Sequence, residues 1–112
     1  MNRAKQQQPT VLVVDDDLEI LNLTRSLMRR RGFSVIEASD GDEAMRQVLE
    51  NRPDLVILDV MMPGQSGWEV CRSIRETDSL KNTGVIMLTG VGHSMNELTS
   101  PLYGADAYLD KP

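Results

Sequence analysis

LVILDVMMPGQSG, residues 55–67, is the stretch that decides the fold of this chain. Four apolar residues in a row predict a buried strand, and the Pro-Gly pair a few positions later predicts a turn. Between them stands Asp59, although a carboxylate is a side chain that protein interiors tolerate poorly. A buried strand that ends on an aspartate therefore directs attention to chemistry at the edge of a sheet.

Length and composition predict a single globular domain. The chain has 112 residues, of which 40% are hydrophobic, and a formal net charge of -5. This length is enough for one hydrophobic core and too short for two. We expect residues 1–9 to form a flexible polar N-terminal arm and residues 10–112 to form the domain. The acidic balance argues against direct nucleic-acid binding by this segment, because phosphate backbones need a basic surface.

The sequence holds no run of eighteen apolar residues, and its polar N-terminus lacks the apolar segment of a signal peptide. We therefore expect a cytoplasmic protein without membrane contact. The single cysteine, Cys71, lies with Val70 and Ile74 at helical spacing, which predicts a buried structural thiol.

Apolar runs alternate with helical patterns along the chain. Strands are expected at residues 10–14, 33–38, 54–58, 84–88 and 105–109. This alternation predicts right-handed crossovers and a parallel sheet that is covered by helices on both faces. Ligands of such sheets bind beyond the carboxyl ends of the strands.

Polar side chains mark where the helices begin. Asp17 is a suitable N-cap for a first helix that ends at Gly32. Pro101 lies inside the fourth helix and crowds the carbonyl of Glu97, so we expect that helix to be short or bent. Capping boxes, in which a capping residue precedes a glutamate by three positions, are predicted at Asp40 with Glu43, Ser66 with Glu69 and Ser94 with Glu97.

Acidic residues follow the first and the third strand. Asp15 and Asp16 stand after the first strand and Asp59 ends the third, whereas Asp17 is explained by its capping role. If these strands are neighbours, the three carboxylates lie close together, and like charges so close either retain a proton or need a cation. Mg²⁺ fits, because it prefers oxygen ligands and takes one or two carboxylates together with waters and phosphate oxygens.

Thr89 and Lys111 stand at the ends of the fourth and fifth strands. Taken singly, a strand-end threonine and a lysine before proline are commonly ordinary residues of a sheet and a loop. Together with the carboxylates they form a set that suits a phosphoryl group on Asp59. Its three oxygens would be bound by Mg²⁺, a hydroxyl and an ammonium group.

The ordered motifs VVDD, LDVMMPGQSG, MLTG and GADAYLDKP resemble the receiver domain of two-component response regulators, from about Thr10 to Pro112. The resemblance implies a flavodoxin-like, doubly wound, five-stranded parallel sheet of strand order 2-1-3-4-5, which places the first and third strands side by side. It also implies that Asp59 accepts a phosphoryl group from the phosphohistidine of a sensor histidine kinase or a phosphotransfer protein. The domain would then be a signalling phosphoacceptor that promotes its own phosphorylation and dephosphorylation, and not an enzyme with a separate substrate.

The resemblance also assigns the metal ligands. Asp16 and Asp59 would bind Mg²⁺ directly, together with the backbone carbonyl of Met61, and Asp15 would act mainly through water. The bond between Lys111 and Pro112 would be cis, which would aim the lysine inward.

A switch follows from the same resemblance. Thr89 would move toward the phosphoryl oxygens and open space that Tyr108 fills, although a half-buried tyrosine of this kind is also an ordinary sheet residue. Met61 and Val91 would flank the path of hydrolytic water, and neither can position a water, so we expect a long-lived phosphoryl group. His93, the only histidine, is expected in a solvated loop, so the chain shows no phosphodonor of its own.

The sequence also departs from the receiver pattern. It stops at Pro112, where receivers continue into a fifth helix, so we expect that helix to be absent from this chain and an output domain or effector protein to lie beyond. Residues 11–14 and 107–109 should then be partly exposed. A receiver-like interaction module that works without phosphorylation stays an alternative. A phosphatase of the haloacid dehalogenase type fits less well, because Glu19 stands where such enzymes need threonine or valine.

Overall fold

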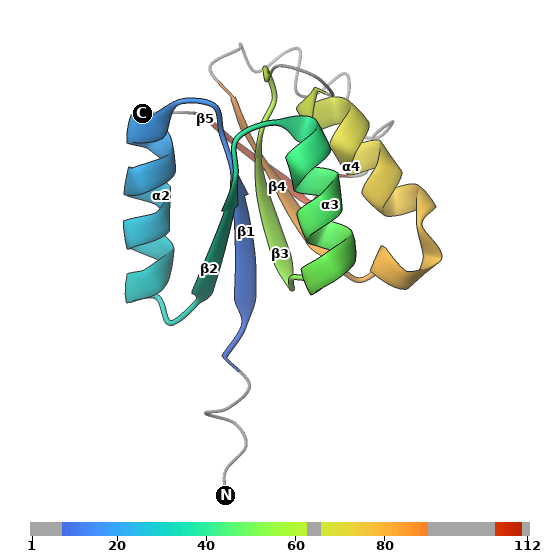
Figure 1. Ribbon diagram of the computed structural model, residues 1–112, viewed down its shortest axis with the longest axis horizontal. Helices are drawn as coiled ribbons and strands as arrows, with labels where there is room; N and C mark the ends of the chain where they lie inside the picture. The colour runs from blue at the N-terminus through green and yellow to red at the C-terminus, as the bar shows by residue number, and fades with distance from the viewer. Residues whose placement is uncertain (1–7, 63–65, 90–104, 111–112) are drawn as a thin grey trace, which may run out of the picture.

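A computed structural model describes residues 8–62, 66–89 and 105–110, and within them the chain alternates between strands and helices (Figure 1). The strands all pair in parallel, in the order β2-β1-β3-β4-β5. The prediction of a flavodoxin-like, doubly wound α/β fold with a parallel sheet is confirmed. The elements are β1 (Thr10–Val14), α2 (Leu18–Arg30), β2 (Ser34–Ala38), α3 (Gly41–Asn51), β3 (Leu55–Asp59), α4 (Gly67–Glu76), a 3-10 turn (Asp78–Leu80), β4 (Gly84–Thr89) and β5 (Ala107–Asp110).

The helix starts follow from the predicted caps. The side chain of Asp17 accepts hydrogen bonds from the N–H groups of Glu19 and Ile20 at the start of α2. The helix is followed by Gly32, whose φ of 92° is a left-handed conformation that favours glycine. Ser66 and Glu69 make both bonds of a capping box at the start of α4.

The cap of α3 differs from the prediction in one bond. Asp40 accepts from the N–H of Glu43 at 2.8 Å, as expected. The carboxylate of Glu43, however, accepts from the N–H of Ser39 at 2.9 Å and not from that of Asp40. The reciprocal bond has moved one residue toward the N-terminus and still satisfies a free backbone donor. The predictions for Ser94 with Glu97 and for Pro101 lie outside the described residues.

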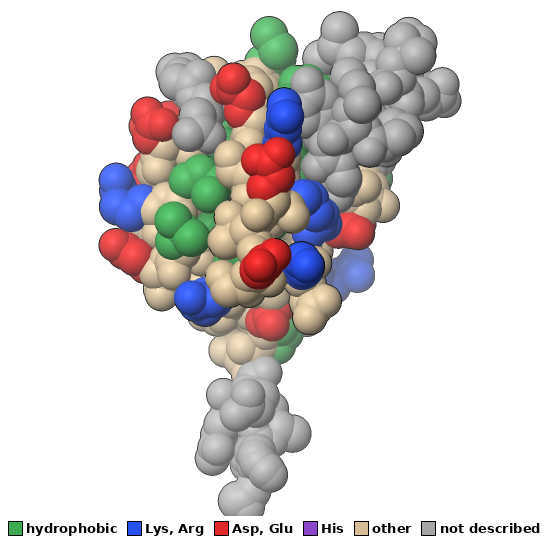
Figure 2. All heavy atoms as spheres, turned by 90° about the vertical axis from the view of Figure 1, so that its right-hand side faces the viewer, with side chains coloured by type: hydrophobic (Ala, Val, Ile, Leu, Met, Phe, Trp, Pro, Cys, Tyr) green, Lys and Arg blue, Asp and Glu red, His purple; other side chains and the backbone are tan. Residues whose placement is uncertain are grey.

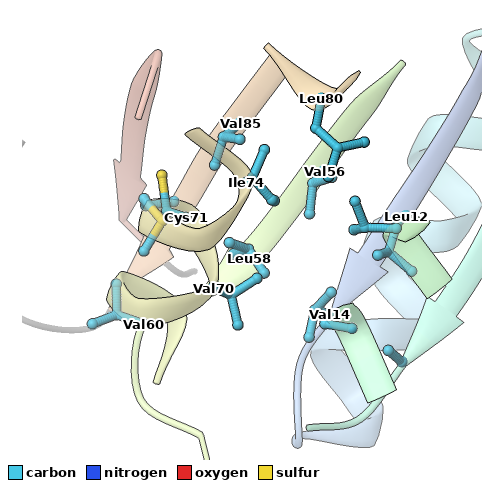
Figure 3. Packing of buried hydrophobic residues seen from close by; sticks show 14 residues of the cluster. Leu12, Val14, Val56, Leu58, Val60, Val70, Cys71, Ile74, Leu80 and Val85 are labelled. Atoms are coloured by element: carbon cyan, nitrogen blue, oxygen red, sulfur yellow. The ribbon is translucent and has the colours of Figure 1, made fainter. Parts of the chain in front are cut away.

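Two apolar clusters hold the layers together. On one face of the sheet α2 packs over Val11, Val13 and Ile57, and on the other α3 and α4 pack over a larger cluster (Figure 3). The larger cluster includes Leu12, Val14, Val56, Leu58, Val60, Val70, Cys71, Ile74, Leu80 and Val85. The helices of the two clusters lie on opposite sides of the sheet (Figure 1). On the α4 side acidic and basic side chains are interspersed (Figure 2), as is usual for a solvated face.

The expectation that residues 11–14 would be partly exposed is wrong. None of these four residues is more than 1% exposed, because β1 lies inside the sheet and is covered by α2 on one face and by the α3–α4 cluster on the other. On β5, Leu109 is 54% exposed, as expected. It lines an apolar groove of about 240 Å³ that runs between α2 and strands β3, β4 and β5. No helix among the described residues is long and apolar enough to cross a membrane.

The thiol of Cys71 is buried, as its helical spacing predicted. Burial raises its pKa from the ordinary 9.0 to about 11, although the nearby Arg75 guanidinium opposes this rise. Because the folded pKa is the higher one, the thiol's contribution to stability is fully present below pH 9 and is lost as the pH rises toward about 11.

Cys71 should therefore resist thiol-specific reagents in the native protein at pH 8. We expect labelling at a rate limited by opening of the core, because both access and thiolate formation are suppressed. The rate is measured with a thiol-specific reagent that releases a coloured product, whose absorbance is followed. Protein unfolded in urea is the control, and it should react at once. Equal rates for native and unfolded protein would contradict the burial of this thiol.

Candidate functional site

The pairing of β1 with β3 brings the acidic residues together. Val14 lies beside Leu58 in the sheet, so the residues that follow them emerge at the same edge. One carboxylate oxygen from each of Asp15, Asp16 and Asp59 lies within 4.8 Å of the other two. Asp15 and Asp59 are 0% and 3% exposed, whereas Asp16 is exposed. The cluster that the sequence predicted is thus present, at the point where the strand order reverses.

Local hydrogen bonds orient the two buried carboxylates. Asp15 Oδ1 accepts from the N–H of Asp17 at 2.9 Å, and Asp59 Oδ1 accepts from the N–H of Met61 at 3.3 Å. Both are turns in which an aspartate binds the backbone two residues on. The chain around them is tied to the sheet, since the N–H of Asp15 donates to the carbonyl of Ala38. These contacts hold the carboxylates at the edge of the sheet.

Gly67, the first residue of α4, is a part of the site that sequence analysis missed. Its N–H donates to the carbonyl of Val60 at 3.0 Å. A Cβ at this position would stand 2.2 Å from the carbonyl oxygen of Asp59, closer than any side chain tolerates. Only glycine lets the start of α4 approach the backbone that carries Asp59. The signal in the sequence is the glycine that ends the LDVMMPGQSG motif.

The cluster suits a small divalent cation. Two ligands on opposite sides of Mg²⁺ are about 4.2 Å apart, because each oxygen lies about 2.1 Å from the ion. The limit of 4.8 Å between the carboxylate oxygens is close to this span. Small side-chain movements, or a bridging water, would complete the coordination of a bound ion. Carboxylate oxygens are also the donor type that this ion prefers.

The remaining predicted site residues are placed only in part. Thr89 ends β4 and is paired with Asp110 of β5, so Lys111 is the next residue after that pair. The side chains of Thr89 and Tyr108 lie outside the described part of the structure. Lys111, the Lys111–Pro112 bond, Val91 and His93 lie outside it altogether, so their roles stay predictions. The ligand role of the Met61 carbonyl also stays a prediction, although the N–H of this residue does contact Asp59.

Fold and site together define a flavodoxin-like α/β domain with an acidic cluster at the carboxyl edge of its sheet. The family model of the response regulator receiver domain matches residues 11–112. The chain belongs to this family, and it is a receiver domain of the kind found in two-component response regulators.

Curated relatives include two named transcriptional regulatory proteins. ResD of Bacillus subtilis is 45% identical over 102 residues, which are 91% of this chain and 41% of ResD. CpxR of Escherichia coli is 41% identical over 102 residues, which are 91% of this chain and 42% of CpxR. The chain therefore spans less than half the length of these relatives.

Solved structures of similar chains share the fold. A putative response regulator from Chloroflexus aurantiacus superposes with a TM-score of 0.89 at 34% identity, covering 95% of this chain and 87% of that one. The chemotaxis response regulator CheY4 of Vibrio cholerae gives a TM-score of 0.88 at 31% identity, covering 95% and 88%.

Substitution Gly67→Ala should destabilise the domain by about 1–3 kcal/mol, the usual cost of forcing an extra methyl group into a packed site. The new Cβ would collide with the Asp59 carbonyl and push α4 away from the end of β3. Urea denaturation followed by the fluorescence of Trp68 measures the change. Glu76→Ala, at the other end of α4, is the control, because it removes only an exposed ion pair with Arg72. A Gly67→Ala variant as stable as the wild type would show that this contact is not tight.

Proposed function

We propose that Asp59 accepts a phosphoryl group from the phosphohistidine of a sensor histidine kinase or a phosphotransfer protein, in a Mg²⁺-dependent reaction. One observation carries this proposal: Asp59 is 3% exposed and is held among two further carboxylates by the N–H of Met61. A hydrophobic strand does not end in a buried, oriented carboxylate beside two others for packing alone. An oriented carboxylate in such a site is suited to act as a nucleophile.

The ion would be held by Asp16, Asp59 and the backbone carbonyl of Met61, with Asp15 acting through water. When bound, Mg²⁺ neutralises charge on the phosphoryl oxygens. The chain's own residues orient the carboxylates. Asp15 keeps its orientation through the Asp17 N–H, and the Met61 N–H keeps Asp59 Oδ1 in place, so the carboxylate that would attack the donor phosphoryl group is already oriented.

Thr89 and Lys111 would bind the other phosphoryl oxygens. Support comes from the sheet, because β4 and β5 are parallel to β3 and end at the same edge as Asp59. Movement of Thr89 and a following change of Tyr108 would then carry the signal away from the site. In this proposal the domain is not an enzyme with a separate substrate. It contributes the groups that promote its own phosphorylation and dephosphorylation.

The phosphorylated domain would act on an output domain or an effector protein beyond Pro112. Support comes from ResD and CpxR, which are transcriptional regulatory proteins more than twice as long as the matched segment. We propose that phosphorylation and output take place in the cytoplasm, without membrane contact and without direct nucleic-acid binding by this segment. The acidic net charge of -5 supports the last point.

Incubation with acetyl phosphate and Mg²⁺ tests the proposal. We expect intact-protein mass spectrometry to show the addition of one phosphoryl group, which chelation of Mg²⁺ prevents. Asp59→Asn should abolish it, because an amide is not a nucleophile of this kind. Asp42→Asn, the same change at an exposed position of α3, should have no effect.

Other outcomes would identify other functions. Continuous turnover of acetyl phosphate would indicate a phosphatase, and a wild-type protein that takes no phosphoryl group would indicate an interaction module that works without phosphorylation.

The phosphoryl group on Asp59 should be long-lived. The exposed Met61 side chain, two residues after Asp59, has no group that can position an attacking water. Met61→Asn should therefore speed up the loss of the phosphoryl group, since an amide can hold a water by hydrogen bonds. Loss is followed by mass spectrometry after removal of acetyl phosphate, with Leu49→Asn on the exposed face of α3 as the control. Loss from the wild type within seconds would refute this prediction.

A further inference from the structure

We propose that Asp106 and Arg75 are positioning residues for phosphorylation, because they clamp the start of β5 onto β4 and so set the place of Lys111. The inference rests on the proposed function of Lys111 as a phosphoryl ligand.

Asp106 stands just before β5 and binds both backbone groups of one residue of β4. Its Oδ2 accepts from the N–H of Val85 at 2.8 Å, and its own N–H donates to the carbonyl of Val85 at 2.8 Å. The same Oδ2 accepts from Arg75 Nη2 at 2.7 Å. One carboxylate oxygen therefore joins β4, the start of β5 and α4.

Arg75 completes the clamp from the last turn of α4. Its Nη1 donates to the carbonyl of Thr83 at 2.7 Å, so the two arms of the guanidinium reach the start of β4 and the start of β5. The planar fork of arginine makes both bonds at once, which the single nitrogen of a lysine cannot do. The Arg75 side chain is 23% exposed and that of Asp106 is 59% exposed. The geometry of this network, more than its charge, is therefore what fixes the strands.

Among the described residues, β5 is joined to the sheet along one side only, by its ladder with β4, and the clamp adds to this ladder at the start of the strand. The strand has four residues, lies at the end of the sheet and pairs with β4 alone. Its register runs from Ile86 beside Ala107 to Thr89 beside Asp110, and Lys111 follows directly. A slip by one residue would move the chain by about 3.3 Å and turn each side chain to the opposite face of the sheet. A phosphoryl ligand at position 111 tolerates no such slip.

The competing interpretation is an ordinary stabilising ion pair. The acidic cluster distinguishes these two interpretations, because its residues come from the ends of β1 and β3, whereas the hydrogen bonds of the clamp described above go to β4 and to the start of β5. A positioning role predicts a slower phosphorylation with an unchanged affinity for Mg²⁺. A general loss of structure predicts that both properties fall together.

The test compares Asp106→Ala with the wild type, using two measurements on the same chain. Mg²⁺ affinity is followed by the fluorescence of Trp68, the only tryptophan, which stands next to Gly67 at the start of α4. The initial rate of phosphorylation is followed with acetyl phosphate at saturating Mg²⁺. We expect the rate to fall by roughly 10- to 100-fold, the range that an ångström of misplacement can cost, and the affinity for Mg²⁺ to stay the same.

Matched variants sharpen the comparison. Asp106→Asn should recover part of the rate, because its amide oxygen still accepts from the N–H of Val85. Asp78→Ala, which removes another acidic partner of an exposed ion pair, should change neither measurement. If Asp106→Ala does not fold, Arg75→Lys takes its place. A lysine can keep one of the two bonds of Arg75, so we expect a decrease in rate smaller than roughly 10- to 100-fold and an unchanged affinity for Mg²⁺.

An unchanged rate in Asp106→Ala, or a parallel loss of rate and Mg²⁺ affinity in the folded variants, would overturn the inference. A wild-type protein that takes no phosphoryl group would instead refute the proposed function, on which the inference rests, and the two failures are thus told apart.

Discussion

The pairing of β1 with β3 is the constraint on which the site depends. It brings one carboxylate oxygen from each of Asp15, Asp16 and Asp59 within 4.8 Å of the other two. Repulsion between two such charges is on the order of a few kcal/mol at the effective dielectric constant of a protein surface. Each fully buried valine or leucine of the two strands contributes about 1.5–3 kcal/mol in the other direction. The strands bury enough of these residues to hold the acids together. The core thus fixes the cluster, and a bound cation would relieve the repulsion that remains.

Helix α4 links that cluster to the far side of the sheet. Its first residue, Gly67, touches the backbone of Asp59, and its last turn holds β4 and β5 through Arg75. A helix of ten residues is about 15 Å long, so α4 reaches from the end of β3 to the start of β4 and β5. Its packing on the core through Val70, Cys71 and Ile74, and not the bonds of Arg75, holds the end that touches Asp59. In the proposed function, the two ends of α4 would therefore support different parts of the same site.

The fold was largely predictable, because burial on both faces gives parallel strands unbroken apolar runs. The third strand was expected at residues 54–58 and runs from Leu55 to Asp59, so the aspartate itself belongs to the sheet. The acidic cluster was predictable because strand ends at one sheet edge are defined by topology. The exposure of residues 11–14 was mispredicted because flanking helices, and not the strand's own sequence, decide how much of a central strand is covered. The contacts of Gly67 and of Arg75 with Asp106 could not be predicted, because no periodicity records which distant backbone a side chain will meet.

Burial of Asp59 affects phosphorylation and hydrolysis differently, because Asp59 is the nucleophile in the first reaction and water is the nucleophile in the second. Only 3% of Asp59 is exposed, so the carboxylate is shielded from bulk water. The neighbouring Asp16 and Met61 are exposed, so a phosphoryl donor would approach Asp59 from their side. Phosphorylation needs only that a donor phosphoryl group come into line with an oxygen that the site already orients. Hydrolysis needs a water to be oriented as well, and the exposed Met61 side chain offers that water no strong hydrogen bond. In the proposed function, the same local structure would favour phosphoryl transfer to Asp59 over hydrolysis of the phosphoryl group.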